Sequence, residues 1–222
     1  MFSKRSTRTR VASESAAVLL GAHPMFLGAS DIQLGVNESL YDTARIVGSM
    51  TDGIMARVGH HSEVEVSLFS SQPTSTFAKA QQTLAEHSGK PVINALSHLY
   101  HPTQILADLL TMIETYSSPL NSFSINDLRG LNVAWIGDSN NILNDMIVSF
   151  GRLGINLNIA TPKGYELDQL VMETREKGLA AENGKGKLLH VNDPEEAVKN
   201  ADIVVTDTWS VLSDLIHTFE YV

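Results

Sequence analysis

The sequence has no cysteine among its 222 residues. Disulfide bonds, thiolate metal sites and cysteine nucleophiles are therefore excluded for this chain. It also has no apolar run that approaches the roughly 18 residues of a membrane-spanning helix, and no signal-peptide core near its first residues. The adjacent His60 and His61 lack a carboxylate at metal-ligand spacing, so we expect no metal site. The chemistry of this protein must rest on charged and polar side chains.

Positive charge is also scarce, because 16 Lys and Arg residues face 25 Asp and Glu residues and leave a net charge of −9. An acidic surface repels nucleic acid and anionic lipid, so we expect neither nucleic acid nor a membrane as a partner. Against this background the stretch "KRSTRTR", residues 4–10, gathers four cations and three hydroxyls. A local basic patch on an acidic chain indicates a small anionic ligand.

Strand-like and helix-like patterns alternate along the chain. Runs of strand length are "PMFLGA", "GIMARV" and "PVINAL", followed by "LNVAWIG", "INLNIATP", "KLLHVND" and "DIVVTDTW". Apolar residues at helical spacing separate many of these runs, for example over 39–50, 103–116 and 140–154, and a further helix is predicted from Tyr165. Gly154 is a typical helix stop, and Asp193 with Pro194 a typical helix start. The alternation predicts an α/β protein with two Rossmann-like domains, whose mostly parallel sheets are flanked by helices.

A polar, turn-rich stretch, "SSPLNSFSIND", separates the two series of strands and helices. We therefore predict a first domain over residues 1–122 and a second over 123–222. Residues 66–83 interrupt the first domain with a Ser-, Thr- and Gln-rich stretch, which predicts a surface loop or an insertion.

The basic patch contains "STRTR", residues 6–10, at the expected start of a helix. Ser6 or Thr7 is placed to cap this helix, whose first N–H groups and positive dipole end attract anions. The hydroxyls of Ser6, Thr7 and Thr9 add donors, and Arg8 can hold a phosphate through two parallel hydrogen bonds. The pattern predicts phosphate binding, although a solvated basic run or a phosphorylation site would have the same composition.

In "HPTQ", residues 101–104, Pro102 suits the first turn of a helix and keeps His101 out of helical geometry. A neutral His101 there could donate to a ligand carbonyl, whereas a partly buried capping histidine is the competing interpretation. Gln104 follows at the same end of the helix. Arg57 ends a predicted strand, where ligands gather in parallel sheets, although a lone arginine there is commonly a surface charge.

The stretch "WIGDSNN", residues 135–141, follows a strand and opens a helix. It lacks the G-x-G-x-x-G pattern because only Gly137 is present, which counts against a dinucleotide site. Asn140 and Asn141 are expected to bind a polar ligand or to cap the helix. Asp207 lies at the end of a strand, where its carboxylate either binds an ammonium group or forms a turn.

In their order and spacing these motifs resemble the aspartate/ornithine carbamoyltransferase family. The shared features are "SxRTR", an arginine after a strand, "HPxQ", and a polar motif that opens the second half. "GDSNNI" with the later "DTW" resembles the ornithine branch of the family, and "LGVNES" and "ATPKGYE" agree with this choice. The resemblance covers most of residues 1–209, apart from 66–83.

The resemblance implies that the carbamoyl group of carbamoyl phosphate is transferred to the δ-amine of L-ornithine. The products would be citrulline and phosphate, in arginine biosynthesis, with no metal and no cofactor. The residues that the resemblance places around the phosphate are Lys4, Ser6, Thr7, Arg8 and Thr9. Arg57 and His101 match residues that polarise the carbamoyl oxygen, so these two and Arg8 are the expected catalytic residues.

Four further residues acquire expected roles from the resemblance. Gln104 matches the residue that holds the carbamoyl nitrogen, and Asn141 and Asp207 match residues that hold the amino-acid end of ornithine. Gln33 matches a position that reaches the site of a neighbouring subunit, which implies a homotrimer. Eukaryotic members act in the mitochondrial matrix and bacterial ones in the cytoplasm, and "LYHPTQILADLLTMIETYSS" is closer to the eukaryotic type.

Departures from the family pattern predict a chain that is truncated at both ends. The chain starts at the phosphate motif, whereas the family has further elements before it. After "DTW", residues 210–222 depart from the family, and Val211 stands where a serine contacts ornithine. The His-Cys-Leu-Pro loop and the final helix of the family are absent. We therefore expect an incomplete second domain and weak or absent turnover.

A second class of function stays open, namely a non-catalytic module that binds carbamoyl phosphate or assembles with full-length subunits. Binding without turnover would identify such a module. The sequence is also compatible with a relative that acts on putrescine or a modified ornithine, and less well with a Rossmann-type oxidoreductase.

Overall fold

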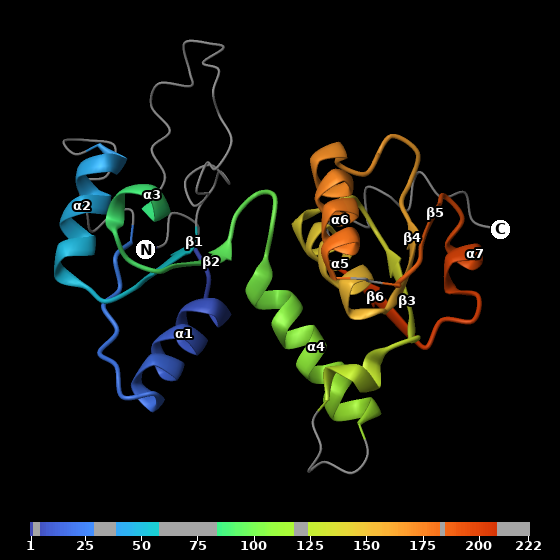
Figure 1. Ribbon diagram of the computed structural model, residues 1–222, viewed down its shortest axis with the longest axis horizontal. Helices are drawn as coiled ribbons and strands as arrows, with labels where there is room; N and C mark the ends of the chain where they lie inside the picture. The colour runs from blue at the N-terminus through green and yellow to red at the C-terminus, as the bar shows by residue number, and fades with distance from the viewer. Residues whose placement is uncertain (2–4, 29–38, 58–83, 118–123, 183–184, 208–222) are drawn as a thin grey trace. The chain divides into compact units, whose positions relative to one another are not determined.

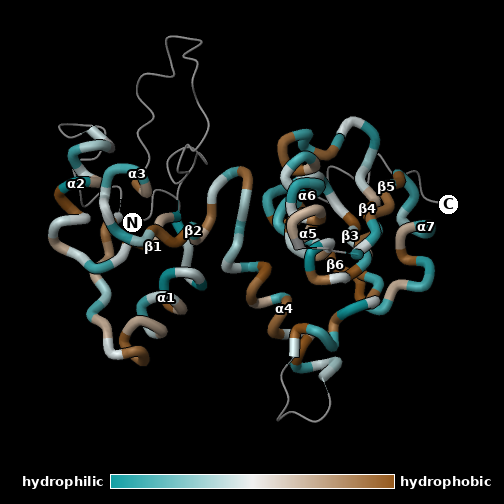
Figure 2. The backbone as a smooth tube through the Cα atoms, in the orientation of Figure 1, coloured by the Kyte–Doolittle hydropathy of each residue, from teal (hydrophilic) through white to brown (hydrophobic). Residues whose placement is uncertain are grey.

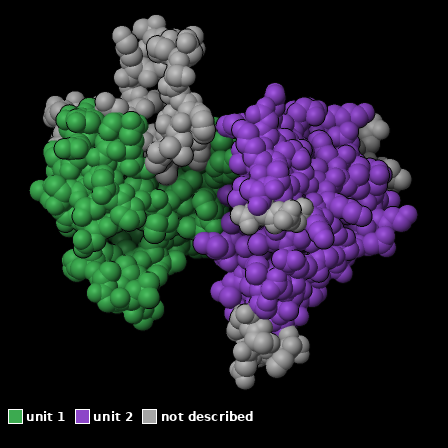
Figure 3. All heavy atoms as spheres, viewed as in Figure 1, with its two compact units in different colours: residues 1–103 green, residues 104–222 purple. Residues whose placement is uncertain are grey.

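The computed structural model describes residues 1, 5–28, 39–57, 84–117, 124–182 and 185–207. Lys4, Gln33, the predicted insertion over 66–83 and the divergent segment over 210–222 lie outside these residues. Within the described part, every helix is too short or too polar to cross a bilayer. The chain divides into two compact units, residues 1–103 and 104–222 (Figure 3).

In its described residues, the first unit contains a small parallel sheet and three helices. In chain order its elements are α1 (Arg8–Leu19), α2 (Leu40–Met50), β1 (Ile54–Arg57), α3 (Leu84–Ser88) and β2 (Val92–Leu96). Strands β1 and β2 pair in parallel, with Ile54 opposite Val92. The predicted strands "GIMARV" and "PVINAL" are thus confirmed to within two residues.

Helix α2 starts within one residue of its predicted bound, and it packs into a small core. The Ser39 hydroxyl accepts the Asp42 N–H at 3.1 Å, which caps the first turn. Ala44 on this helix lies in a small core with Ala56 of β1 and Leu84 of α3. Gly48 faces the last residue of α3 so closely that a Cβ would lie 2.1 Å from the Ser88 carbonyl oxygen. The approach of α2 to α3 therefore requires glycine at this position.

Helix α1 differs from α2 because none of its side chains is buried. Its apolar residues gather at the C-terminal end (Figure 2), where Leu19 and Leu20 are each 86% exposed. The described part of the first unit therefore gives α1 little core packing. Polar contacts near its first turn hold it instead.

The predicted strand "PMFLGA" is wrong for Pro24–Leu27, which form no strand. Pro24 has no N–H to donate to a strand ladder. The Phe26 ring instead stacks under the Arg10 guanidinium, 3.5 Å from its carbon. A short apolar run without period-2 alternation cannot by itself distinguish a strand from a segment that packs irregularly.

The second unit is a four-stranded parallel sheet with helices on both faces. Its strands are β3 (Asn132–Ile136), β4 (Asn156–Ala160), β5 (Leu188–Val191) and β6 (Ile203–Thr206), in the order β5-β4-β3-β6. Its helices are α4 (Pro102–Tyr116, continuing from the first unit), the 3-10 turn η3 (Ile125–Leu128), α5 (Asn141–Leu153), α6 (Gln169–Glu182) and α7 (Pro194–Val198). Figure 1 shows α5 and α6 on one face of the sheet and α7 on the other. The prediction of an α/β fold with parallel sheets is confirmed.

The core of this unit lies around the central strand β3, whose middle residues are buried. Trp135 is fully buried there, as is Phe150 of α5. The predicted stop of α5 is confirmed, since Gly154 has φ +78° and its N–H donates to the Gly151 carbonyl at 3.2 Å. The predicted start of α7 is also confirmed, because Asp193 accepts the Glu195 N–H at 2.9 Å and Pro194 follows it.

The start of α6 was predicted four residues too early. The helix begins at Gln169, and the Asp168 carboxylate accepts the N–H groups of Leu170 at 2.8 Å and Val171 at 3.2 Å. Tyr165, the predicted first residue, donates its N–H to the Pro162 carbonyl in a turn. Asp168 is a strong N-cap residue, so this boundary was readable from the sequence.

The strand order places a topological switch point between β3 and β6. From β3 the chain adds β4 and β5 on one side, and it then returns to add β6 on the other. Connections leave neighbouring strands in opposite directions at such a point, and a crevice opens beyond their carboxyl ends. Asp138 follows β3 and Asp207 follows β6, so the topology brings these two segments together.

Candidate functional site

The basic motif of the first unit opens helix α1 as predicted. The Ser6 hydroxyl accepts the Thr9 N–H at 3.2 Å, so Ser6 performs the capping for which Ser6 and Thr7 were candidates. Thr7 makes no side-chain cap bond, and Thr7 and Arg8 are exposed. The first turn of α1 therefore presents a guanidinium and a hydroxyl to solvent beside the positive end of a helix dipole.

Arg57 reaches this turn from the end of strand β1. Its Nη1 donates to the Thr9 hydroxyl oxygen at 3.4 Å, across 48 residues of sequence. Burial lowers the pKa of the Arg57 guanidinium, but such a group remains a cation at neutral pH. Two of the predicted phosphate-site segments are thus brought together.

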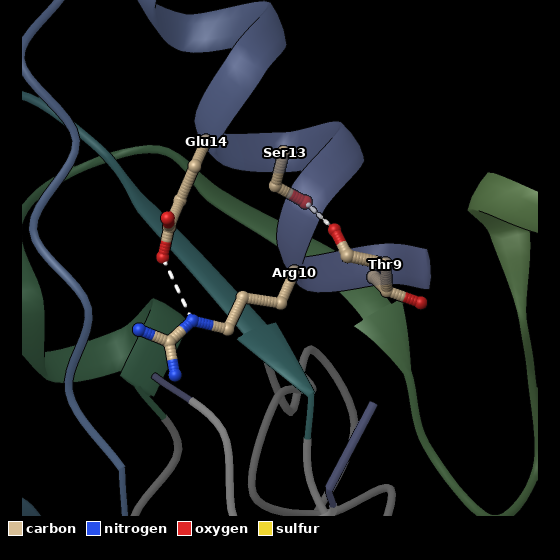
Figure 4. A network of polar contacts seen from close by, with 4 residues as sticks. All are labelled: Thr9, Arg10, Ser13 and Glu14. Atoms are coloured by element: carbon tan, nitrogen blue, oxygen red, sulfur yellow. Dashed lines mark hydrogen bonds and ion pairs between the residues drawn. The ribbon is translucent and has the colours of Figure 1, made fainter. Parts of the chain in front are cut away.

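Arg10, the last cation of "KRSTRTR", points elsewhere. Its Nε donates to the Glu14 carboxylate at 3.0 Å, one turn further along α1 (Figure 4). Ser13 on the same turn donates to the Thr9 carbonyl at 2.6 Å. Together with the Phe26 ring, Glu14 commits Arg10 to the structure of α1. The cationic patch available to a ligand is therefore smaller than the sequence suggests.

His101 is held by the loop that connects β2 to α4. Ser97 is fully buried and starts this loop; it accepts the Tyr100 N–H through its hydroxyl oxygen at 3.1 Å. Thr103 then contacts His101, with 3.2 Å between Oγ1 and Nδ1, and donates to the Ala95 carbonyl at 2.9 Å. Because Thr103 has one proton and gives it to Ala95, its oxygen accepts from Nδ1–H. In this arrangement the proton of a neutral His101 ring lies on Nδ1. A neutral His101 that donates to a ligand from Nε2, as the sequence predicts, needs the opposite tautomer.

Gln104 lies in the first turn of α4, as the sequence predicts. Its Nε2 donates to a carboxylate oxygen of Asp108, one turn along the helix, at 2.9 Å. Burial raises the pKa of Asp108, and the hydrogen bond from Gln104 opposes this rise. The sequence interpretation singled out Gln104 but not Asp108, although the i,i+4 spacing marks the two as neighbours on a helix.

In the second unit, Asn140 ties together the ends of β3 and β6 and the start of α5. Its Oδ1 accepts the N–H groups of Ile142 at 3.0 Å and Leu143 at 3.2 Å, which caps the helix. Its Nδ2 donates to Asp138 at 3.1 Å and to Asp207 at 2.8 Å. The expected capping by Asn140 is confirmed, whereas its two donated bonds were not predicted. The bond to Asp207 links residues 67 apart in sequence, which no local pattern reveals.

The two carboxylates that share Asn140 form an anionic cluster at the switch point. Burial raises the pKa of Asp138, and the charge of Asp207 raises it further. The bonds from Asn140 and from the Asp138 backbone act in the opposite direction. The Trp135 indole fixes the turn by donating to the Asp138 carbonyl at 3.0 Å. A cluster of this charge at the end of a parallel sheet is suited to a cationic group.

The remaining predicted site residues divide into two groups. Asn141 is the first residue of α5, half-buried and next to Asn140 at the switch point. Lys4 and Gln33 lie outside the described residues.

No group of three or more His, Asp or Glu residues suited to a metal ion occurs in the described part of the chain.

Comparisons with known proteins match both units to one family. Residues 1–114 match the model of the "Aspartate/ornithine carbamoyltransferase, carbamoyl-P binding domain". Residues 129–218 match the model of the "Aspartate/ornithine carbamoyltransferase, Asp/Orn binding domain". The first match covers the cationic residues around Arg57 and Thr9, and the second covers the anionic cluster of Asp138 and Asp207.

Individual proteins agree with the family models. The chain is 51% identical over 209 residues to a mitochondrial ornithine carbamoyltransferase of Aspergillus terreus, covering 94% of this chain and 53% of the relative. The crystal structure of a mitochondrial ornithine carbamoyltransferase from Coccidioides immitis matches with a TM-score of 0.80 and 43% identity, over 100% of this chain and 64% of that one. An anabolic ornithine carbamoyltransferase from Campylobacter jejuni matches with a TM-score of 0.74 and 37% identity, over 96% and 62%.

The chain spans about half the length of the curated relatives that it matches. Family models nevertheless match most of its residues, and the solved relatives share its fold along nearly all of its length. The chain belongs to the aspartate/ornithine carbamoyltransferase family, on the side of the ornithine carbamoyltransferases.

Proposed function

We propose that this chain acts as an ornithine carbamoyltransferase, which transfers the carbamoyl group of carbamoyl phosphate to the δ-amine of L-ornithine. Citrulline and phosphate are the products, and the reaction serves arginine biosynthesis. The observation that carries the proposal is the contact between Arg57 and Thr9, because it joins two cationic motifs into one anion-binding cluster. The proposed binding regions are residues 1–122 for carbamoyl phosphate and 123–222 for ornithine.

In this proposal the phosphate is held at the start of α1. Arg8 is exposed in the first helical turn and can approach two phosphate oxygens at once. The hydroxyls of Ser6, Thr7 and Thr9, the helix dipole and the Lys4 ammonium add to the attraction. Charge grows on the phosphate oxygens as the C–O bond breaks, so these groups stabilise the transition state more than the ground state.

The carbamoyl oxygen is the second place where negative charge develops. Arg57 and His101 are the proposed donors to this oxygen, and Gln104 accepts from the carbamoyl nitrogen. The neutral δ-amine of ornithine attacks the carbamoyl carbon, the C–N bond forms, the C–O bond to phosphate breaks, and the departing phosphate takes up the proton that the amine loses. The named side chains stabilise the charge that develops on the carbamoyl and phosphate oxygens, and the leaving phosphate supplies the base.

Ornithine is proposed to bind with its amino-acid end at the switch point of the second unit. Asp207 accepts from the α-ammonium group, and Asn141 contacts the same end of the substrate. The anionic cluster of Asp138 and Asp207 supports a cationic rather than a dicarboxylic acceptor. We further propose a homotrimer in which Gln33 reaches a neighbouring site, and a mitochondrial matrix location, because many curated relatives carry "mitochondrial" in their names.

A citrulline assay on the purified chain with carbamoyl phosphate and ornithine tests the proposal. Arg8→Ala should lower the rate by about 100-fold or more, since it removes a donor to developing charge. Arg45→Ala is the matched control, because Arg45 is exposed on α2 and its loss changes the net charge equally. Citrulline from the unaltered chain and the control, but not from Arg8→Ala, supports a transferase.

The same experiment distinguishes the non-catalytic class of function. Calorimetry with carbamoyl phosphate, run beside the assay, detects binding that does not lead to product. Binding that Arg8→Ala abolishes, without citrulline from a chain that is folded by circular dichroism, contradicts the transferase. That result would instead identify a module that binds carbamoyl phosphate.

A further inference from the structure

The pair of Gln104 and Asp108 fixes the orientation of a side-chain amide. Both residues lie on α4, one turn apart, and both are half-buried. The distance of 2.9 Å from Gln104 Nε2 to Asp108 Oδ1 is that of a good hydrogen bond. An ionised carboxylate accepts and cannot donate, so the amide nitrogen, not the amide oxygen, must face Asp108.

The direction of the other amide atom follows from this contact. Nitrogen and oxygen lie on opposite sides of the planar amide carbon, so Oε1 points away from the Asp108 carboxylate. Burial raises the pKa of Asp108, which is the cost of holding a carboxylate at this position. Because Asp108 accepts from Nε2, the Oε1 atom of Gln104 is left to accept a hydrogen bond from another group.

From this geometry we infer that Asp108 is a positioning residue, which presents Gln104 Oε1 to an N–H of the bound carbamoyl group. Asp108 thereby sets a preference for carbamoyl phosphate over acyl phosphates that lack an N–H, such as acetyl phosphate. The inference rests on the proposed function, in which Gln104 holds the carbamoyl nitrogen. It adds a residue and a specificity that the proposed function does not contain.

The expected size of the preference follows from the cost of an unmet hydrogen bond. A methyl group in place of the carbamoyl NH2 leaves Oε1 desolvated without a donor. Sites built to hydrogen-bond a ligand group discriminate strongly against an analogue that lacks it. Without Asp108 the amide can rotate and expose Nε2 instead, so the preference should fall by about tenfold.

The experiment compares three anions with the unaltered chain and with variants at these two positions. Binding of carbamoyl phosphate, acetyl phosphate and inorganic phosphate is measured by calorimetry. Asp108→Leu keeps the shape but removes the acceptor, whereas Asp108→Glu keeps a carboxylate that only accepts and serves as the conservative rescue. Gln104→Ala and the double variant Gln104→Ala/Asp108→Leu test whether Asp108 acts through Gln104.

The inference predicts that Asp108→Leu weakens carbamoyl phosphate binding about tenfold and leaves the other two anions within about twofold. Asp108→Glu should retain most of the preference, and Asp108→Leu should add nothing in the Gln104→Ala background. A merely structural role for Asp108 would weaken all three anions together. The side-chain amide signals of Gln104 in NMR spectra should also shift in Asp108→Leu without any ligand.

Each contrary outcome overturns a defined claim. Equal losses for the three anions, no loss at all, or unchanged Gln104 amide signals would overturn the inference and leave the proposed function standing. Phosphate binding without a preference for carbamoyl over acetyl phosphate in the unaltered chain would do the same. A chain that binds none of the three anions would overturn the proposed function and the inference with it.

Discussion

The two units hold their polar clusters together in different ways. In the first unit, the Arg57 guanidinium donates to the Thr9 hydroxyl at 3.4 Å. In the second unit, Asn140 joins two strand ends and a helix start through four hydrogen bonds of 2.8–3.2 Å. Every donor and acceptor of the Asn140 side chain has a partner in the protein. The Asn140 amide therefore fixes the geometry of its cluster through shorter hydrogen bonds than the 3.4 Å contact between Thr9 and Arg57.

The largest expected loss of stability comes from a substitution in the core of the second unit. Trp135→Ala removes a fully buried side chain from the central strand and the indole that donates to Asp138, and should cost about 3–5 kcal/mol in unfolding free energy. Trp135→Phe keeps most of the volume and should cost clearly less. Urea unfolding followed by circular dichroism measures both. A loss for Trp135→Ala no larger than that for Trp135→Phe would contradict the role of the buried volume.

In the first unit, the corresponding substitution adds a single methyl group where α2 approaches α3. Gly48→Ala places a Cβ 2.1 Å from the Ser88 carbonyl oxygen, so α2 and α3 must separate, at about 1–3 kcal/mol. Gly53→Ala is the matched control, because its Cβ would lie 3.7 Å from the nearest atom, the Pro91 carbonyl oxygen. Thermal unfolding of the two variants should differ in midpoint. Equal midpoints would show that the helices accommodate the added group.

A smaller effect sharpens the comparison at Asn140. Asn140→Ala removes the cap of α5 and both donors to the carboxylates, and should cost about 1–2 kcal/mol. Asn140→Ser keeps a cap acceptor without the donors, so it should recover part of the stability. Chemical unfolding gives the stability of both variants. If the serine variant is as unstable as the alanine variant, the cap is not the main contribution of this residue.

The smallest expected effect depends on pH. The pKa of Asp138 in the folded chain is raised by burial and by Asp207, so the folded state binds a proton more readily than the unfolded state. This contribution is fully present below the unfolded pKa of about 4 and is lost as pH rises through the raised value. Asp138→Asn removes the carboxyl group and with it the loss of stability at high pH. The stability of this variant relative to the unaltered chain should therefore be higher at pH 7 than at pH 3, and urea unfolding at several pH values checks this. A difference that stays constant with pH would contradict it.

The sequence predicts the framework better than the clusters. Strand β3 and helices α2 and α5 lie within one residue of their predicted bounds, because apolar periodicity and caps such as Asn140 and Gly154 are local signals. The strand over Pro24–Leu27 was wrong because Phe26 packs against Arg10 and not in a sheet. A short apolar run carries no information about which partner it will meet.

The site residues follow the same division. Ser6 was a predicted cap, and the structure confirms its bond to Thr9. Asp108 was not predicted, although it follows Gln104 by four residues on a helix. The spacing shows that the two side chains are neighbours, but it does not show that they form a hydrogen bond. The bonds from Asn140 to two carboxylates arise from the strand order, which brings the ends of β3 and β6 together, and the residue pattern does not encode that order directly.

Asn140 also sets how much substitution this position of the chain can tolerate. Its side chain has two donor hydrogens and two acceptor lone pairs, and all four are used. Aspartate offers no donor, serine offers too few, and glutamine carries the same groups one methylene too far from the backbone. Of the twenty amino acids only asparagine meets the full set of demands, so random mutagenesis with selection for a stable fold should return asparagine at this position most often.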